Sequence, residues 1–218
     1  MKIAVFGATG RTGVLFVHQA VQENLYVKLY CRPQSLSKLG SLKSNEFVEI
    51  IEGEFDDDFT PVIQGVDVVL SFLGPGFSWP SNNPLEKVMI KIMETMRKER
   101  VTRFLTMGTG SITDSLDRNW YKMRTCVFIV SSFARNAYND IVAVGNLFKS
   151  GQYDDLKWTI VRVGILKNAN EPTGRIHVGY IGDDEASIFT ERADWAKFVL
   201  TEISEEKWIR KLPYLSSV

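Results

Sequence analysis

Three glycines near the amino terminus have the spacing of a phosphate-binding turn. They are Gly7, Gly10 and Gly13 in the segment VFGATGRTG. Between a strand and a helix, the first glycine turns the chain, the second lets the backbone approach a diphosphate, and the third lets the helix pack on the sheet. N–H groups at the start of the helix then face the anion. The alternative is an ordinary tight turn that needs glycine for positive φ. The residues expected to contact the ligand are Gly7, Thr9, Gly10, Arg11, Thr12 and Gly13.

The residues after the second expected strand indicate which dinucleotide would bind. An NAD site has a carboxylate there, which accepts hydrogen bonds from the ribose 2′-OH. This chain has Arg32, followed by Ser35 and Lys38, with no carboxylate among them. Because a guanidinium binds a 2′-phosphate with paired hydrogen bonds, the pattern predicts NADP(H), with Arg11 as a second positive contact. The alternative is that Arg32 and Lys38 are solvated charges at a helix start.

Few other side chains have the spacing of a catalytic or metal site. The chain has two histidines, of which His18 is expected to be a surface or packing residue. His177, in RIHVGYIGDD, is a candidate acid/base group, with a structural histidine as the alternative. Asp56, Asp57 and Asp58 are consecutive and lack a histidine or cysteine at ligand spacing, so they predict a solvated loop.

The segments that must position these residues alternate between strand and helix patterns. Short apolar and β-branched runs predict strands, and apolar residues repeated every three to four positions predict helices. The expected strands are Lys2–Phe6, Tyr26–Tyr30, Phe47–Ile51, Val66–Phe72, Arg103–Met107, Lys157–Val163 and a short terminal strand near Trp208–Leu212. The expected helices are Arg11–Gln22, about Pro84–Arg100, a pair within about Trp120–Lys149 broken near Ser131–Asn136, and about Arg192–Ser204.

This alternation predicts an α/β fold: one Rossmann-like domain over residues 1–218, with a doubly wound, mainly parallel sheet and helices on both faces. Small elements at about 165–190 are expected on the substrate side. No segment repeats, and 44% apolar with 24% charged residues is typical of a chain that folds around a core.

The charge balance and the apolar pattern exclude several partners. Lys plus Arg and Asp plus Glu each number 26, so no surplus positive charge favours nucleic acid as the main partner. No run of 18 apolar residues predicts a membrane span, and no signal peptide is expected. Cys31 and Cys126 lie far apart in the chain, which favours a reducing cytoplasm over a disulfide framework.

Four segments in this order resemble the atypical short-chain dehydrogenases/reductases, a group that includes NmrA-like proteins and the flavin reductase/biliverdin reductase B type. The segments are KIAVFGATGRTG, RFLTMGTGS, LKWTIVRVGIL and IFTERADWAKFVLTEI. The resemblance implies that the nicotinamide side of the cofactor is lined after strands four, five and six, and that an acidic residue after strand three lies near adenine. The residues so implicated are Leu73, Gly74, Gly108, Val163 and Asp56.

The chain departs from the short-chain pattern at its catalytic pair, because neither candidate tyrosine in the segment 120–149 has a lysine four positions later. Tyr121 is followed four positions later by Thr125, and Tyr138 by Val142. Tyr138 is therefore a candidate without the lysine that would lower its pKa. The resemblance places Ser111 near the nicotinamide, with Thr109 beside it; both would act by hydrogen bonding to a substrate oxygen. The alternative for both is a polar loop that satisfies its own backbone.

Two aromatic segments could form an apolar pocket for a flat or hydrophobic small molecule. One is PGFSWP, with Phe77 and Trp79; the other is NWYKMRTCVFIVSSFARNAY. The alternative for the second is a helix whose apolar face packs on the domain or on a second subunit of a homodimer. Its aromatic residues are Trp120, Tyr121, Phe128 and Phe133.

These observations predict an NADP(H)-dependent reductase that transfers hydride between nicotinamide and a small organic substrate. Two other functions stay open. One is an isomerase or cyclase that uses the aromatic pocket without net redox turnover, which the lack of a lysine four positions after Tyr121 or Tyr138 favours. The other is an NmrA-like regulator whose affinity for a protein partner depends on NADP(H).

Overall fold

The computed structural model describes residues 1–76 and 78–218 and centres on a sheet that holds eight strands among them. Their order is β3-β2-β1-β4-β5-β6-β10-β8, and all neighbours are parallel except β10 and β8. A separate pair, β7 and β9, is parallel. The order reverses between β1 and β4, which is where ligands of open α/β sheets bind. The strands are β1 (Lys2–Phe6), β2 (Tyr26–Cys31), β3 (Val48–Glu52), β4 (Val68–Ser71), β5 (Arg103–Thr109), β6 (Lys157–Val163), β7 (Ile165–Lys167), β8 (Ile176–Gly179), β9 (Phe189–Glu191) and β10 (Tyr214–Ser217).

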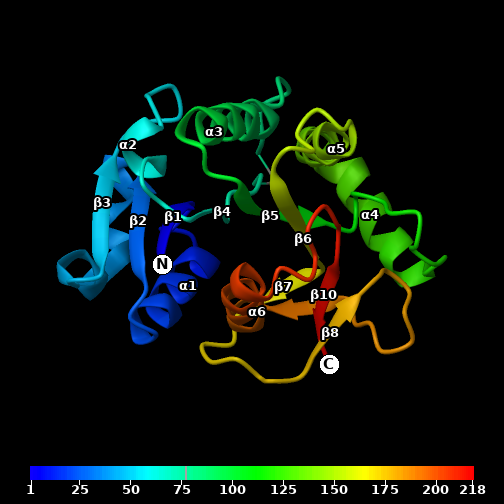
Figure 1. Cartoon of the computed structure of the whole chain (residues 1–218). Helices are drawn as coiled ribbons and strands as arrows, with labels where there is room; N and C mark the ends of the chain where they lie inside the picture. The colour runs from blue at the N-terminus through cyan, green and yellow to red at the C-terminus, as the bar shows by residue number, and fades with distance from the viewer. Residues whose placement is uncertain (77) are drawn as a thin grey trace.

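Helices cover both faces of the sheet (Figure 1): α1 and α6 lie on one face, and α2, α3 and α5 on the other. The inner strands are apolar without alternation because both of their faces are covered. None of the helices in the described part of the chain is long and apolar enough to cross a membrane. The helices are α1 (Arg11–Gln22), the 3₁₀ helix η1 (Pro33–Ser44), α2 (Thr60–Ile63), α3 (Pro84–Glu99), α4 (Tyr121–Phe133), α5 (Arg135–Lys149) and α6 (Arg192–Glu205). The predicted α/β, Rossmann-like class is confirmed.

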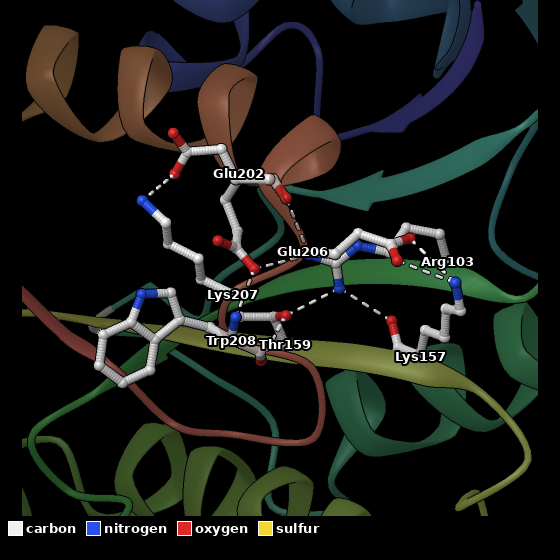
Figure 2. A network of polar contacts seen from close by, with 8 residues as sticks. Arg103, Lys157, Thr159, Glu202, Glu206, Lys207 and Trp208 are labelled. Carbon is white, nitrogen blue, oxygen red and sulfur yellow. Dashed lines mark hydrogen bonds and ion pairs between the residues drawn. The ribbon is translucent and has the colours of Figure 1, made fainter.

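A buried ion pair joins the sheet to α6, as Figure 2 shows. Arg103 Nη2 on β5 lies 2.9 Å from Glu202 Oε1 on α6, and both side chains are at least 96% buried. The guanidinium also donates to Thr159 Oγ1 at 2.8 Å, and the Trp208 N–H donates to the Glu202 carboxylate at 2.8 Å. Burial raises the pKa of Glu202, against the opposing effects of the Trp208 N–H and Arg103. The network fixes β5, β6 and α6 near the amino ends of the strands.

A second buried carboxylate fixes the start of α3. Asp140 on α5 is fully buried and accepts the backbone N–H groups of Leu85 and Glu86, each at 2.9 Å. It also accepts the Trp79 indole N–H at 2.6 Å. Since Asn83 makes no side-chain cap, Asp140 supplies the acceptor that the first turn of this helix needs.

Most expected elements agree with the structure to within a few residues, but the prediction of the terminal strand is wrong. Residues 207–210 form a turn, in which Arg210 has a φ of 54°. The Lys211 N–H donates to Trp208 O, and Lys211 forms an isolated bridge with Thr159 on β6. The strand is Tyr214–Ser217 instead. The expected break within 120–149 is narrower than 131–136, because α4 ends at Phe133 and α5 starts at Arg135. The small elements within 165–190 are β7, β8 and the start of β9.

Candidate functional site

The glycine turn lies between β1 and α1, as its spacing predicts. Gly7 has a φ of +77°, and a Cβ there would lie 2.9 Å from the carbonyl carbon of Phe72, which directly follows β4. The Gly10 N–H donates to Gly7 O at 3.0 Å, and Gly10 is the N-cap of α1. Only glycine combines this φ with so close an approach of two chain segments. The turn therefore lies at the point where the strand order reverses.

The third glycine has a packing role. A Cβ at Gly13 would lie 2.7 Å from Ala8 Cα and would overlap Gly7 O. Gly13 and Thr12 are buried, whereas Gly10 and Arg11 are exposed and Thr9 is half-buried. The turn thus has a buried side against the sheet and an open side at the start of the helix. An anion on the open side would meet the unpaired N–H groups of the first helical turn.

The positively charged residues after β2 lie at the start of η1. Arg32 is its N-cap, is exposed, and has its guanidinium carbon 5.9 Å from the centre of the Phe55 ring. The Ser35 N–H donates to Arg32 O at 2.8 Å and Ser35 is buried, while Lys38 is exposed. The Arg32 guanidinium is therefore held over an aromatic ring beside the end of β2, where the adenosine end of a dinucleotide is expected.

The three aspartates after β3 have local roles. Asp57 accepts the Glu54 N–H at 2.8 Å, and Asp58 accepts both the N–H and the hydroxyl of Thr60. These bonds hold the pKa of Asp58 below its ordinary value. Asp56 is exposed. In the described part of the chain, no group of three or more histidine, cysteine, aspartate or glutamate residues is arranged to hold a metal.

The segments after β4 and β5 pack closely on each other. A Cβ at Gly74 would overlap the end of the Met107 side chain, and one at Gly108 would lie 2.5 Å from Ile160 Cγ2. The Leu73 N–H lies 3.4 Å from Ser71 Oγ. Glycine at these two positions therefore allows close packing at the carboxyl ends of β4 and β5.

An apolar cavity of about 220 Å³ lies at the carboxyl ends of β5 and β6. It brings together Thr109, Ser111 and Val163, three of the residues predicted for this region. One face of α4, within the second predicted aromatic segment, forms its other wall, but through Met123, Cys126, Val127 and Val130 and not through the predicted aromatic residues. The described residues that line it are Thr109, Gly110, Ser111, Met123, Cys126, Val127, Val130, Val163, Gly164, Ile165 and Ile188.

A buried ion pair anchors the loop that carries the Thr109 and Ser111 hydroxyls. Arg162 on β6 is fully buried and forms a paired contact with the Asp117 carboxylate, at 2.6 and 2.8 Å. The same guanidinium donates to Ile112 O at 2.9 Å. The Ser111 N–H donates to Thr109 Oγ1 at 3.2 Å, so this hydroxyl satisfies the backbone, as the alternative interpretation expects.

The other two catalytic candidates are not among the described residues that line the cavity. Tyr138 is half-buried on α5. His177 lies on the edge strand β8, with Nε2 3.2 Å from Asp183 Oδ2 and Nδ1 3.9 Å from Glu185 Oε2. These contacts link the imidazole to the loop after β8, as the structural alternative expects. His18 is exposed on α1.

The aromatic residues divide between packing and surface. Phe77 lies outside the described residues, and Trp79 donates its indole N–H to Asp140, so it fixes α3. Tyr121, Phe128 and Phe133 on α4 are 70% to 84% exposed. The segment is thus a helix with one face on the cavity and one in solvent. If the chain forms a homodimer through this helix, the second subunit would cover its solvent face.

A family model described as "NAD(P)H-binding" matches residues 7–206. The chain belongs to this NAD(P)H-binding family. The match includes the glycine turn, the cavity and all of α6. Among curated proteins, none matches this sequence.

Solved structures with low sequence identity share the whole fold. A short-chain dehydrogenase/reductase from Veillonella parvula in complex with NADP has a TM-score of 0.78 at 16% identity, over 99% of this chain and 94% of that one. The oxidoreductase ylbE from Lactococcus lactis has a TM-score of 0.77 at 18% identity, over 100% and 91%. At this identity the likeness shows a shared fold and nothing more.

Proposed function

We propose that the protein is an NADP(H)-dependent reductase of a small, uncharged, apolar substrate. The observation that carries the proposal is the pairing of two sites along one sheet edge. One is the glycine turn with Arg32 beyond it, and the other is the apolar cavity after β5 and β6. Membership of the NAD(P)H-binding family supports the first, and the choice of NADP(H) over NAD(H) rests on Arg32.

The residues of the chain would bind and orient the reactants. Bound NADPH supplies the hydride. The open side of the turn, next to Gly10, would bind the diphosphate through backbone N–H groups, and the Arg32 guanidinium would bind the 2′-phosphate. Ser111 would donate its hydroxyl to a substrate oxygen in the cavity, while Thr109 holds the loop through its bond to the Ser111 N–H.

The cavity walls suggest the substrate class. Its described lining contains no charged side chain, and Met123, Val127 and Ile165 contribute apolar surface. A charged group placed there would lose hydration without a partner, so an uncharged ring compound such as a quinone fits better than a carboxylic acid. The free thiols Cys31 and Cys126 support a reducing, cytoplasmic location.

Nucleotide binding and turnover test this proposal separately. Calorimetry with wild type should give tighter binding of NADPH than NADH, and Arg32→Ala should weaken NADPH by about tenfold or more with little change for NADH. Equal losses for both nucleotides would refute the role of Arg32. Consumption of NADPH in the presence of quinones should then identify the substrate class.

A second function is favoured because Tyr138 lies away from the cavity lining and has no lysine four positions later. The Tyr-x-x-x-Lys of the chain, Tyr153 to Lys157, also lies outside the described lining, and the Tyr153 hydroxyl donates to Glu94 Oε1 at 2.9 Å. This second function is a cofactor-fold isomerase or cyclase. Substrate conversion without oxidation of NADPH would support it over the reductase. Tight cofactor binding without any conversion would instead support an NmrA-like regulatory protein.

A further inference from the structure

A second pocket, with a volume of about 480 Å³, lies beside the glycine turn and between segments that are distant in sequence. α1 and α6 run side by side there: Gln19 Nε2 donates to Ala193 O at 3.2 Å. The first residue of α6, Arg192, therefore faces the first turn of α1. The described lining is Thr9, Arg11, Val14, Leu15, Asn168, Ala169, Asn170 and Arg192.

Two guanidinium groups converge on one neutral acceptor in this pocket. Asn168 Oδ1 lies 2.6 Å from Arg192 Nη1 and 3.4 Å from Arg11 Nη1. Arg192 Nη1 also donates to Lys167 O at 2.9 Å and to Leu166 O at 3.2 Å. These contacts hold the Arg192 side chain along the segment after β6 and leave its Nε and Nη2 without a hydrogen-bond partner among the described residues.

The positive charge of the pair is not balanced by the protein. Among the described residues, neither Arg11 nor Arg192 has a carboxylate oxygen within 4.0 Å, although the chain contains as many acidic as basic side chains. Burial and the nearby Arg11 lower the pKa of Arg192, with Glu191 opposing the shift. Two adjacent cations without a carboxylate favour an anion between them.

The position of the pocket identifies the anion. Thr9 and Arg11 flank Gly10, whose exposed side opens to the N-terminus of α1, where the dinucleotide diphosphate is expected. We propose that Arg192, together with Arg11, binds the diphosphate of the nicotinamide nucleotide, and that Asn168 occupies the two guanidinium groups until the nucleotide arrives. This inference rests on the proposed function, because it requires that the protein bind NADP(H).

Two kinds of cationic contact are expected in the nucleotide site. The diphosphate is common to NADH and NADPH, so Arg192 contributes equally to both. The 2′-phosphate is present only in NADPH, so Arg32 contributes to NADPH alone. Arg11, whose side chain lies with Asn168, belongs to the first kind in this arrangement. A defect confined to the 2′-phosphate site would weaken the binding of NADPH alone. Equal weakening of NADH and NADPH binding therefore indicates a contact with the diphosphate.

Calorimetry with NADPH and NADH on four proteins tests the inference. Arg192→Gln should raise both dissociation constants by about tenfold, because a charged contact to phosphate is lost. Asn168→Asp places a carboxylate between the guanidinium groups, so it should weaken both nucleotides similarly while the unliganded protein keeps or gains thermal stability. Exposed Arg175, whose side chain makes no hydrogen bond or ion pair among the described residues, is the matched control, and Arg175→Gln should bind as wild type does.

The results separate a failure of the diphosphate role of Arg192 from a failure of the proposed function. If wild type binds neither nucleotide, the proposed function fails. If wild type binds NADPH but Arg192→Gln binds it equally well, the diphosphate role is overturned and the proposed function stands. A loss for NADPH alone would assign Arg192 to the 2′-phosphate and would also overturn the inference. Should Arg192→Gln unfold, Asn168→Asp decides, since Asn168 is exposed.

Discussion

The three glycines of the turn have different roles, and alanine substitutions can separate them. At Gly13 an added Cβ meets main-chain atoms, 2.7 Å from Ala8 Cα and 2.9 Å from Ala8 C. Overpacking of this kind costs about 1–3 kcal/mol, and the upper part applies because backbone cannot move aside as a side chain can. Alanine recovers up to about 1 kcal/mol through helix propensity. Gly13→Ala should therefore lose about 2 kcal/mol, or about 4–8 °C in Tm.

At Gly10 the same change should affect binding and leave the fold intact. The added Cβ would approach only Gly7 O, at 3.2 Å, and the backbone angles, φ −74° and ψ 161°, suit any residue. Stability should change by less than about 1 kcal/mol. The methyl group would stand on the open side of the turn, so NADPH binding should weaken by about tenfold or more.

Thermal unfolding of the unliganded variants, followed by calorimetry with NADPH, measures both effects. Gly10→Ala should match wild type in Tm and fail in binding. Gly13→Ala should melt earlier. Equal Tm losses for the two variants, or wild-type affinity in Gly10→Ala, would refute the assignment of packing to one glycine and ligand approach to the other.

Two further predictions concern networks away from the turn. Glu202→Gln leaves the buried Arg103 charge without its partner and should cost about 3 kcal/mol in urea unfolding, whereas the double variant Arg103→Met/Glu202→Leu should lose less; equal losses would contradict the ion-pair account. The hydrogen bond from Arg97 holds the pKa of Asp155 below its ordinary value, so its contribution is fully present at neutral pH and is lost progressively as pH falls from about 4 through the lowered pKa. Asp155→Asn should therefore cost more stability at pH 7 than at pH 3, and equal losses at the two pH values would refute this.

Local patterns predicted the elements that are buried on both faces or that have one apolar face. Lys2–Phe6, Arg11–Gln22 and Lys157–Val163 have the expected bounds because their own residues favour a strand or a helix. Ile165–Lys167 and Phe189–Glu191 are three residues each, which is too short to carry a periodicity of their own. They are strands because they pair with each other, which only the folded chain arranges.

The terminal strand shows how a tertiary contact can override a local pattern. Trp208 begins a segment rich in large apolar residues, which is typical of a strand. Its N–H is instead used by the Glu202 carboxylate, and the following turn at Arg210 has positive φ. Beyond the turn, Lys211 forms an isolated parallel bridge with Thr159 on β6, and continuous pairing with β6 begins at Tyr214. The contact with Glu202 thus accompanies a turn where the local pattern favours a strand.

The two halves of the candidate site differ in the same way: one follows from a local pattern and the other depends on tertiary contacts. A diphosphate-binding turn uses backbone N–H groups and the φ angles that glycine allows, and all of these lie in one short segment. The cofactor-binding half of the site can therefore be identified from sequence. The substrate half consists of one face of α4 against the ends of β5 and β6, and its apolar residues resemble any helix face that packs on a core. Arg192 shows the limit most clearly: it reaches the pocket beside Arg11 only because α6 lies alongside α1. Since nothing near it in sequence marks a phosphate site, its role follows from which helices are neighbours, and binding to both nucleotides is the measurement that can detect it.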